Sequence, residues 1–150
     1  MTALQPETAA VAQWASDLAG YSLDAAAQLG EVFPASGQGM RTCALPFAVR
    51  SEESLLIVRG VLWIGYLPDA SEASQAGLIA LADTLARRLN SPGRMAGAAA
   101  DAIQAKLQPK GCAALVKSWS PYVPDISGAV EYRGCLLSDP YRREFLELCA

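Results

Sequence analysis

The chain has 150 residues, of which 52% are hydrophobic, and its formal net charge is −3. This is the length of one ordinary domain with a hydrophobic core. The isoelectric point near 4.9 argues against a nucleic-acid-binding protein, which needs a basic face to neutralise phosphates. No apolar run reaches the roughly 18 residues of a membrane span. The acidic N-terminal stretch also lacks the pattern of a secretion signal. We therefore expect a cytoplasmic protein that binds neither nucleic acid nor membrane.

The histidine and cysteine counts limit the chemistry. The sequence contains no histidine and four cysteines, none of them in a Cys-x-x-Cys pair. Histidine is the commonest metal ligand and the usual acid–base group near neutral pH. Isolated cysteines in a cytosolic chain are typically buried free thiols. Any site must therefore use carboxylates, hydroxyls, tyrosine, lysine or thiols, and we expect no cofactor.

The N-terminal part is predicted to be helical. Residues 6–19 place apolar side chains on one helical stripe, with Pro6 suited to a first turn. Residues 21–30 predict a second short helix that Gly30 closes. Residues 31–39 are predicted to form a loop.

Strands and helices then alternate in pairs. The predicted strands are 41–50, 55–67, 112–119 and 128–137, and the predicted helices are 74–89, 95–107 and 140–149. Residues 67–74 are predicted to be a turn, and the proline-limited stretch 120–127 is predicted to be a loop. Asp139 is a plausible cap of the last helix, with Pro140 at its first position. This order indicates an α+β protein with an antiparallel sheet.

Several phrases resemble one protein family in their order and spacing. They are "GYSLDAAAQLGEVFPA", "GYLPD", "LARRL", "ADAIQAKLQPKG" and "RGCLLSDPYRREFLEL". Together they resemble GTP cyclohydrolase I, of the tunnelling-fold superfamily. The resemblance implies a four-stranded antiparallel sheet with two antiparallel helices inserted, plus N-terminal helices and a C-terminal helix. It implies a single domain over residues 1–150, with the N-terminal helices in 1–36 and the core in 37–150. It also implies a homo-oligomeric ring of subunits, a decamer being one form.

Residues 51–54, Ser-Glu-Glu-Ser, interrupt the first two strands at the family's metal motif. Counted back from "GYLPD", they fall on the family's Cys-Glu-His-His, whose cysteine and second histidine bind zinc. Glu53 replaces the first histidine, which transfers protons in the family. The family's later His-x-Cys falls at Ser120 and Tyr122. Hydroxyls do not replace thiolate and imidazole as zinc ligands, so we expect no metal.

A looser alignment places Cys43, in "TCALPF", on the family's metal-binding cysteine. It needs both histidines deleted and an insertion, and it keeps a single ligand. The register through Ser51 needs one deletion between Met40 and Asp69, and we prefer it.

The family's substrate contacts have also changed. Its phosphate-binding lysine and arginine fall near Gly77 and Ala80. Its Gln-Glu pair, which anchors guanine, falls at Pro92 and Gly93, and a later arginine falls near Ile126. A triphosphate needs several cations or a nest of backbone N–H groups. We therefore expect no activity on GTP.

Two hypotheses remain for the function. In the first, the protein is a metal-independent cyclase, isomerase or lyase that acts on a non-nucleotide, largely apolar intermediate, in secondary metabolism. A carboxylate pair in such a pocket can split its pKa values into an acid and a base. In the second, it is a catalytically dead paralogue with a binding, regulatory or assembly role in pterin or natural-product metabolism, and the two carboxylates are merely solvated. The loss of every metal ligand and phosphate cation, while the helix faces persist, favours the first.

The first hypothesis assigns roles to particular residues. Glu53 would transfer the proton, Glu52 would orient it, and Tyr122 would donate a hydrogen bond to developing negative charge. The catalytic candidates are Glu53, Glu52, Tyr122 and Ser120, and the substrate-binding candidates are Trp63, Trp119, Ser51, Ser54, Asp125 and Lys117. Ordinary strand packing would equally account for Tyr122 and Trp63, and plain surface exposure for Lys117 and Asp125.

Overall fold

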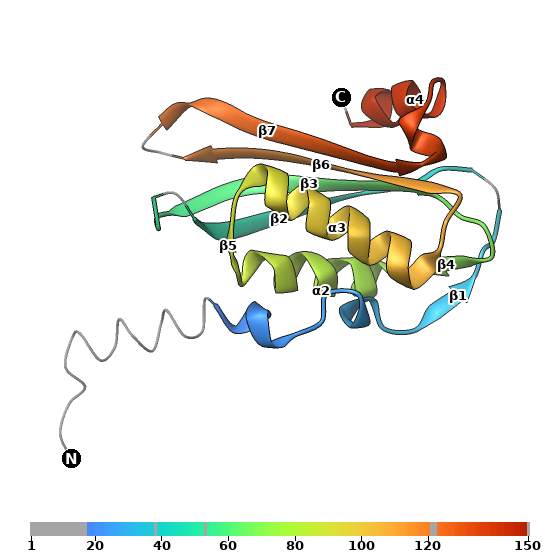
Figure 1. Cartoon of the computed structure of the whole chain (residues 1–150), viewed down its shortest axis with the longest axis horizontal. Helices are drawn as coiled ribbons and strands as arrows, with labels where there is room; N and C mark the ends of the chain where they lie inside the picture. Colours follow the sequence, from blue (N-terminus) through green and yellow to red (C-terminus); the bar gives the residue numbers. More distant parts are fainter. Residues whose placement is uncertain (1–17, 38, 53, 121–122, 150) are drawn as a thin grey trace, which may run out of the picture.

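A computed structural model of the chain describes residues 18–37, 39–52, 54–120 and 123–149, except for the side chains of Leu89 and of residues 120 and 123–127 (Figure 1). Its main feature is a sheet with the strand order β5-β2-β3-β6-β7. The four long strands are β2 (Arg41–Ser51), β3 (Ile57–Leu67), β6 (Gly111–Ser120) and β7 (Val123–Gly134). Each runs antiparallel to its neighbour, as predicted. The two-residue β5 (Leu89–Asn90) pairs in parallel with the end of β2.

Two helices inserted between β3 and β6 cover one face of the sheet (Figure 1). They are α2 (Gln75–Ala86) and α3 (Pro92–Leu107). The Ser91 hydroxyl accepts a hydrogen bond from the Arg94 N–H at 3.3 Å, and Pro92 occupies the first turn. This cap explains why α3 begins three residues before the predicted start, since Ser and Pro both favour a helix beginning there.

The main core lies between these helices and the sheet. Leu62, Ile64 and Val116 from the strands pack with Leu81 and Leu85 of α2. Several buried alanines on α3 let that helix lie close to the strands. Alternate residues of β3 and β6 point into this core, as the period of two in a strand requires.

The opposite face of the sheet is covered at one end by α4 (Tyr141–Leu148), which follows the short helix η3 (Cys135–Leu137). Phe145 is fully buried against Gly65, where any larger side chain would collide with its ring. The Tyr132 ring meets Phe145 edge to face at 6.5 Å, and the Arg142 guanidinium lies 5.8 Å from the centre of the Tyr132 ring. These contacts hold α4 on the sheet.

Four sequence-based predictions for local structure are wrong. The segments 31–39 and 67–74 are not free of strands, because β1 (Val32–Pro34) pairs with β4 (Ser71–Ala73). The ion pair of Arg41 with Glu72, at 3.1 Å, tethers this small sheet to β2. The predicted loop 120–127 contains the start of β7, and the end of the predicted strand 128–137 is η3. Pro124 is compatible with β7 because β7 is an edge strand.

A fifth correction concerns the cap of α4. Its N-cap is Pro140, without a side-chain hydrogen bond, and Asp139 instead lies 3.7 Å from Arg142.

The N-terminal helices differ from the prediction as well. The segment 6–17 lies outside the described residues. In place of a helix over 21–30 there are two single turns, η1 (Ala19–Ser22) and η2 (Ala27–Leu29). Arg88, at the end of α2, donates hydrogen bonds to the carbonyls of Gly20 and Leu23 at 3.1 and 2.8 Å. These tertiary bonds compete with continuous helical pairing. No helix in the described part of the chain is both long and apolar enough to cross a membrane.

Candidate functional site

Three connections of the chain meet at one end of the sheet. The strand register pairs Arg50 with Ile57 beside the β2–β3 turn, and Ser120 with Val123 beside the β6–β7 turn. The pairing of Arg59 with Trp119 sets both turns at the same end. The start of α3 lies at this end as well, because β5, just before α3, pairs with Arg50 and Ser51 (Figure 1). The fold thus brings Ser51, Glu52, Ser54 and the backbone of Ser120, all from the sequence-predicted site, to one end of the sheet.

The β2–β3 turn is closed by its own backbone and hydroxyls. The Ser51 carbonyl accepts from the Leu55 N–H at 2.9 Å, and the Ser51 N–H donates to Leu56 at 2.9 Å. The Ser51 Oγ accepts from the Ser54 N–H at 3.4 Å, and the Ser54 Oγ accepts from the Leu56 N–H at 3.3 Å. Both serine hydroxyls therefore stabilise the turn by accepting hydrogen bonds from its backbone N–H groups.

Leu55 carries the strain of this turn. Its φ of 61° lies in the left-handed region, which a branched apolar residue seldom adopts. Arg50 stabilises this conformation, because its Nη1 donates to the Leu55 carbonyl at 2.7 Å. Backbone strain of this kind is concentrated at binding and catalytic sites.

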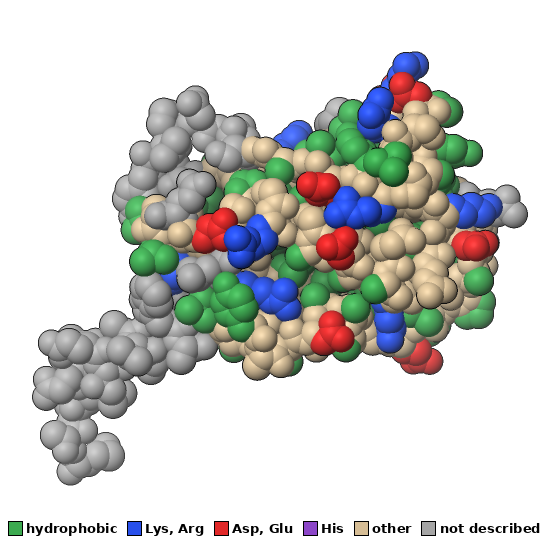
Figure 2. All heavy atoms as spheres, in the orientation of Figure 1, with side chains coloured by type: hydrophobic (Ala, Val, Ile, Leu, Met, Phe, Trp, Pro, Cys, Tyr) green, Lys and Arg blue, Asp and Glu red, His purple; other side chains and the backbone are tan. Residues whose placement is uncertain are grey.

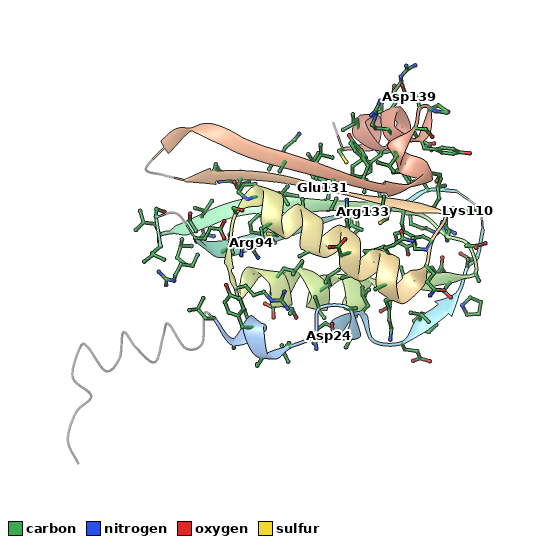
Figure 3. All side chains as sticks on the ribbon, viewed as in Figure 1. Asp24, Arg94, Lys110, Glu131, Arg133 and Asp139 are labelled. Carbon is green, nitrogen blue, oxygen red and sulfur yellow. The ribbon has the colours of Figure 1, made fainter. Side chains whose placement is uncertain are left out.

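Glu52 is fixed against the start of α3. Its backbone N–H donates to the Asn90 carbonyl at 3.1 Å, and its Oε2 lies 3.1 Å from the Nε of Arg94. Figure 3 labels Arg94 near the start of α3. The Glu52 side chain is 29% exposed and that of Arg94 is 68% exposed, so the carboxylate is the more enclosed partner. The positive end of the helix dipole adds to this attraction.

The sequence analysis missed two residues here, Asn90 and Arg94. Asn90 is buried, its Nδ2 donates to the Leu85 carbonyl at 2.8 Å, and its Oδ1 has no hydrogen-bond partner among the described residues. The sequence did contain a signal for both residues. Asn90 is a polar residue directly after the apolar stripe of α2, and Arg94 lies in the first turn of the following helix, α3.

The two tryptophans lie apart from Glu52. Trp63 packs with the α4 cluster, on the face of the sheet opposite α2 and α3. Trp119 points to that same face, because it alternates with the buried Ser118, and it is 45% exposed. Lys117 shares this face and is exposed. The structure therefore brings Trp119 and Lys117 to the same end of the sheet as Glu52, but on the other side of it.

Glu53 and Tyr122 lie outside the described residues. Ser120 ends β6 and Asp125 lies in β7, and only their backbone positions are described.

The donor set does not fit a zinc ion. In the part of the chain that the structure describes, no three Asp, Glu, Cys or His side chains gather in a way that could hold a metal. Cys43 lies near the start of β2, opposite Ile64 and at the far end of the strand from the turn that carries Ser51. Burial raises the pKa of the Cys43 thiol, which disfavours the thiolate that binds metals.

Gly77 lies near the position where the sequence comparison places the family's phosphate-binding lysine. A Cβ placed on Gly77 would collide with the carbonyl oxygen of Leu29 in η2. The N-terminal segment therefore packs directly on the first turn of α2, and the backbone excludes any side chain at this position.

The comparisons with known proteins agree with this architecture. No protein-family profile matches the chain. GTP cyclohydrolase 1 of Wolinella succinogenes is 33% identical over 103 residues, which are 67% of this chain and 55% of that protein. The chain thus spans about half the length of this relative. The archaeosine synthase QueF-Like in its apo form matches with a TM-score of 0.60 and 14% identity, over 66% of this chain and 97% of that chain.

The order of strands and inserted helices, together with the structural match, defines a tunnelling-fold protein. Within that class the chain is a distant homologue of GTP cyclohydrolase I. Both the predicted resemblance and the predicted α+β fold are confirmed.

Proposed function

We propose that this protein is a metal-independent acid–base enzyme, a cyclase, isomerase or lyase, acting on a non-nucleotide, largely apolar biosynthetic intermediate. The observation that carries the proposal is the placement of Glu52 beside the first turn of α3, where Arg94 holds its carboxylate. A carboxylate fixed in this way can orient a neighbouring acid–base group without moving during the reaction.

In the proposed mechanism Glu53 removes a proton from a carbon next to a carbonyl. The electron pair moves to the carbonyl oxygen, where Tyr122 donates a hydrogen bond to the developing charge. Glu53 then returns the proton to another carbon of the same substrate, so that no outside reactant is needed. Glu52 would stay paired with Arg94 and orient the neighbouring base.

The loss of nucleotide contacts supports the choice of substrate class. Gly77 leaves no room for the phosphate-binding lysine, and Pro92 and Gly93 stand where the family reads guanine. A substrate without a triphosphate needs neither group.

A second candidate function is a binding or assembly role. It is favoured by the serine hydroxyls, which the turn already uses, and by the pairing of Glu52 with Arg94. An ordinary solvated turn would have the same contacts.

Carbon-acid exchange distinguishes the two functions. A panel of apolar ketones and β-keto esters is incubated with the protein in deuterated water, and loss of the C–H signals is followed by nuclear magnetic resonance. We expect Glu53→Gln to slow exchange by about 100-fold or more, as for other positioned bases. Glu147→Gln, on the exposed side of α4, is the matched control and should exchange at the wild-type rate. Equal rates for the wild type and Glu53→Gln would refute the acid–base assignment and favour the binding role.

We also propose that the chain assembles into a ring. Beyond Arg50 and Ser51, β2 has no strand on its outer edge, and β7 has none either, within the described residues. These edges run in opposite directions, so β7 of one copy could extend the antiparallel sheet of the next. Ring closure would leave no exposed edge. Light scattering at micromolar concentration should show an oligomer, and a stable monomer would contradict the proposal.

A further inference from the structure

Among the described residues, only α4 covers the face of the sheet opposite α2 and α3, and it covers one end of that face. Cross-strand partners point to the same side of a sheet, so the register defines rows of side chains that run across this face. We call three of these rows the open face. They are Ala48–Arg59–Trp119, Pro46–Val61–Lys117–Gly128 and Ala44–Trp63–Leu115–Val130. The next row contains Gly65 and Tyr132, and Phe145 of α4 covers it. Trp63 and Leu115, in the third row of the open face, are half-buried because they pack against the edge of this α4 cluster.

On the open face the larger side chains lie on the central strands β3 and β6, and most of the outer positions carry small residues. Its β2 positions are alanine and proline, and its outermost position in the second row is Gly128. The large side chains lie in the middle, on β3 and β6. Trp119 is 45% exposed and Val130 is 37% exposed, which is more than core residues of a closed sheet would be. A flat apolar molecule could contact this surface over several rows.

The charges on the open face have one sign. Arg59 and Lys117 are both exposed, and neither forms an ion pair or hydrogen bond with any residue in the described part of the chain. The three rows contain no acidic residue. The helix-bearing side mixes acidic and basic side chains (Figure 2), and pairs such as Arg133 with Asp101 and Glu131 neutralise them there. In a chain of net charge −3, an uncompensated cationic face is unusual.

The two cations are close enough to act together. Lys117 is the cross-strand partner of Val61, and Arg59 lies two residues before Val61 on β3. Diagonal neighbours of this kind have Cβ atoms about 7 Å apart, so one carboxylate can reach both. Trp119 is the direct partner of Arg59 and offers an aromatic surface beside the charges.

We propose that the open face binds an apolar, preferably planar small molecule that carries a carboxylate or another anionic group. Arg59 and Lys117 bind the anion, and Trp119, Val61 and Trp63 contact the apolar body. This inference rests on the proposed function, because it gives the substrate of that enzyme a negative charge. The row of Arg59 and Trp119 lies at the same end of the sheet as the turns of the candidate site.

The test compares two fluorescent probes with the same ring system. 8-Anilinonaphthalene-1-sulfonate is an aromatic anion, and N-phenyl-1-naphthylamine lacks the sulfonate. The full chain is titrated with each probe at low and high salt. We expect the anionic probe to bind more tightly at low salt. Arg59→Gln and Lys117→Gln should each weaken it about three- to fivefold, the range for exposed charge pairs, and the double variant about tenfold. Binding of the uncharged probe should change little.

Two further variants control for charge and apolar contact. Lys106→Gln removes one positive charge from the exposed side of α3 and should leave both probes unaffected. Trp119→Ala should weaken both probes, because the apolar contact is common to them. The proposal is overturned if Arg59→Gln and Lys117→Gln bind the anionic probe as the wild type does, or if Lys106→Gln weakens it equally.

The same experiment separates this inference from the proposed function. Glu53→Gln should bind both probes normally, since it removes only the proton-transfer group. Charge-dependent probe binding without Glu53-dependent exchange would leave the anion site standing and refute the acid–base enzyme. Glu53-dependent exchange without charge-dependent probe binding would support the acid–base enzyme and refute the anion site.

Discussion

Replacing Gly77 with alanine tests the packing that excludes a phosphate-binding side chain. The added methyl group would meet the backbone carbonyl of Leu29, which cannot move away as a flexible side chain could. Overpacking of this kind costs about 1–3 kcal/mol. The preference of a helix for alanine over glycine, up to about 1 kcal/mol, offsets part of it. We therefore expect Gly77→Ala to lower the free energy of unfolding by about 1–2 kcal/mol.

Gly97 provides a matched control within the other helix. A Cβ on Gly97 would meet no atom within 4 Å, so Gly97→Ala should raise the free energy of unfolding by about 0.5–1 kcal/mol. Both variants are measured by urea unfolding at one fixed protein concentration, since oligomerisation would shift the midpoint. We therefore predict changes of opposite sign in the free energy of unfolding, a decrease for Gly77→Ala and an increase for Gly97→Ala. A Gly77→Ala variant as stable as the wild type would show that η2 does not pack on α2 in this way, and the steric argument against a side chain at position 77 would fail.

Three further predictions concern other parts of the molecule. Phe145→Ala should lower the free energy of unfolding by about 3–5 kcal/mol, because the fully buried ring fills the space between Gly65 and α4; a loss under 1 kcal/mol would mean that α4 is not docked there. The purified protein should convert no GTP, even with added zinc, and should contain far less than one zinc per chain by elemental analysis. Product formation above the blank, or stoichiometric zinc after dialysis, would contradict this. Burial raises the pKa of the Cys112 thiol from 9.0 to about 12. Above pH 9 the unfolded thiol therefore loses its proton while the buried one keeps it, so stability falls as the pH rises toward 12. Cys112→Ala should flatten this decline between pH 9 and 11, and an unchanged slope would rule out this thiol as a cause.

The sequence determined the elements with strong periodicity. Alternating apolar residues located β2 and β3, and the helical stripes located α2, α3 and α4, because each pattern must bury one face. The family phrases placed the 51–54 turn at a strand end. Local signals were weaker where tertiary contacts decide the conformation. The Arg41–Glu72 ion pair joins β4 to β2, and hydrogen bonds from Arg88 accompany η1 in place of a longer helix.

The candidate site divided in the same way. The sequence, through the family resemblance, predicted that residues 51–54 and Ser120 belong to one site. It could not decide which side of the sheet each side chain faces, because that depends on the cross-strand register and on which face the helices cover. The tertiary structure separated Trp63 and Trp119 from Glu52, and it paired Glu52 with Arg94 from a helix 42 positions along the chain. Only packing in three dimensions brings such distant residues together and leaves the Arg59 and Lys117 side of the sheet open.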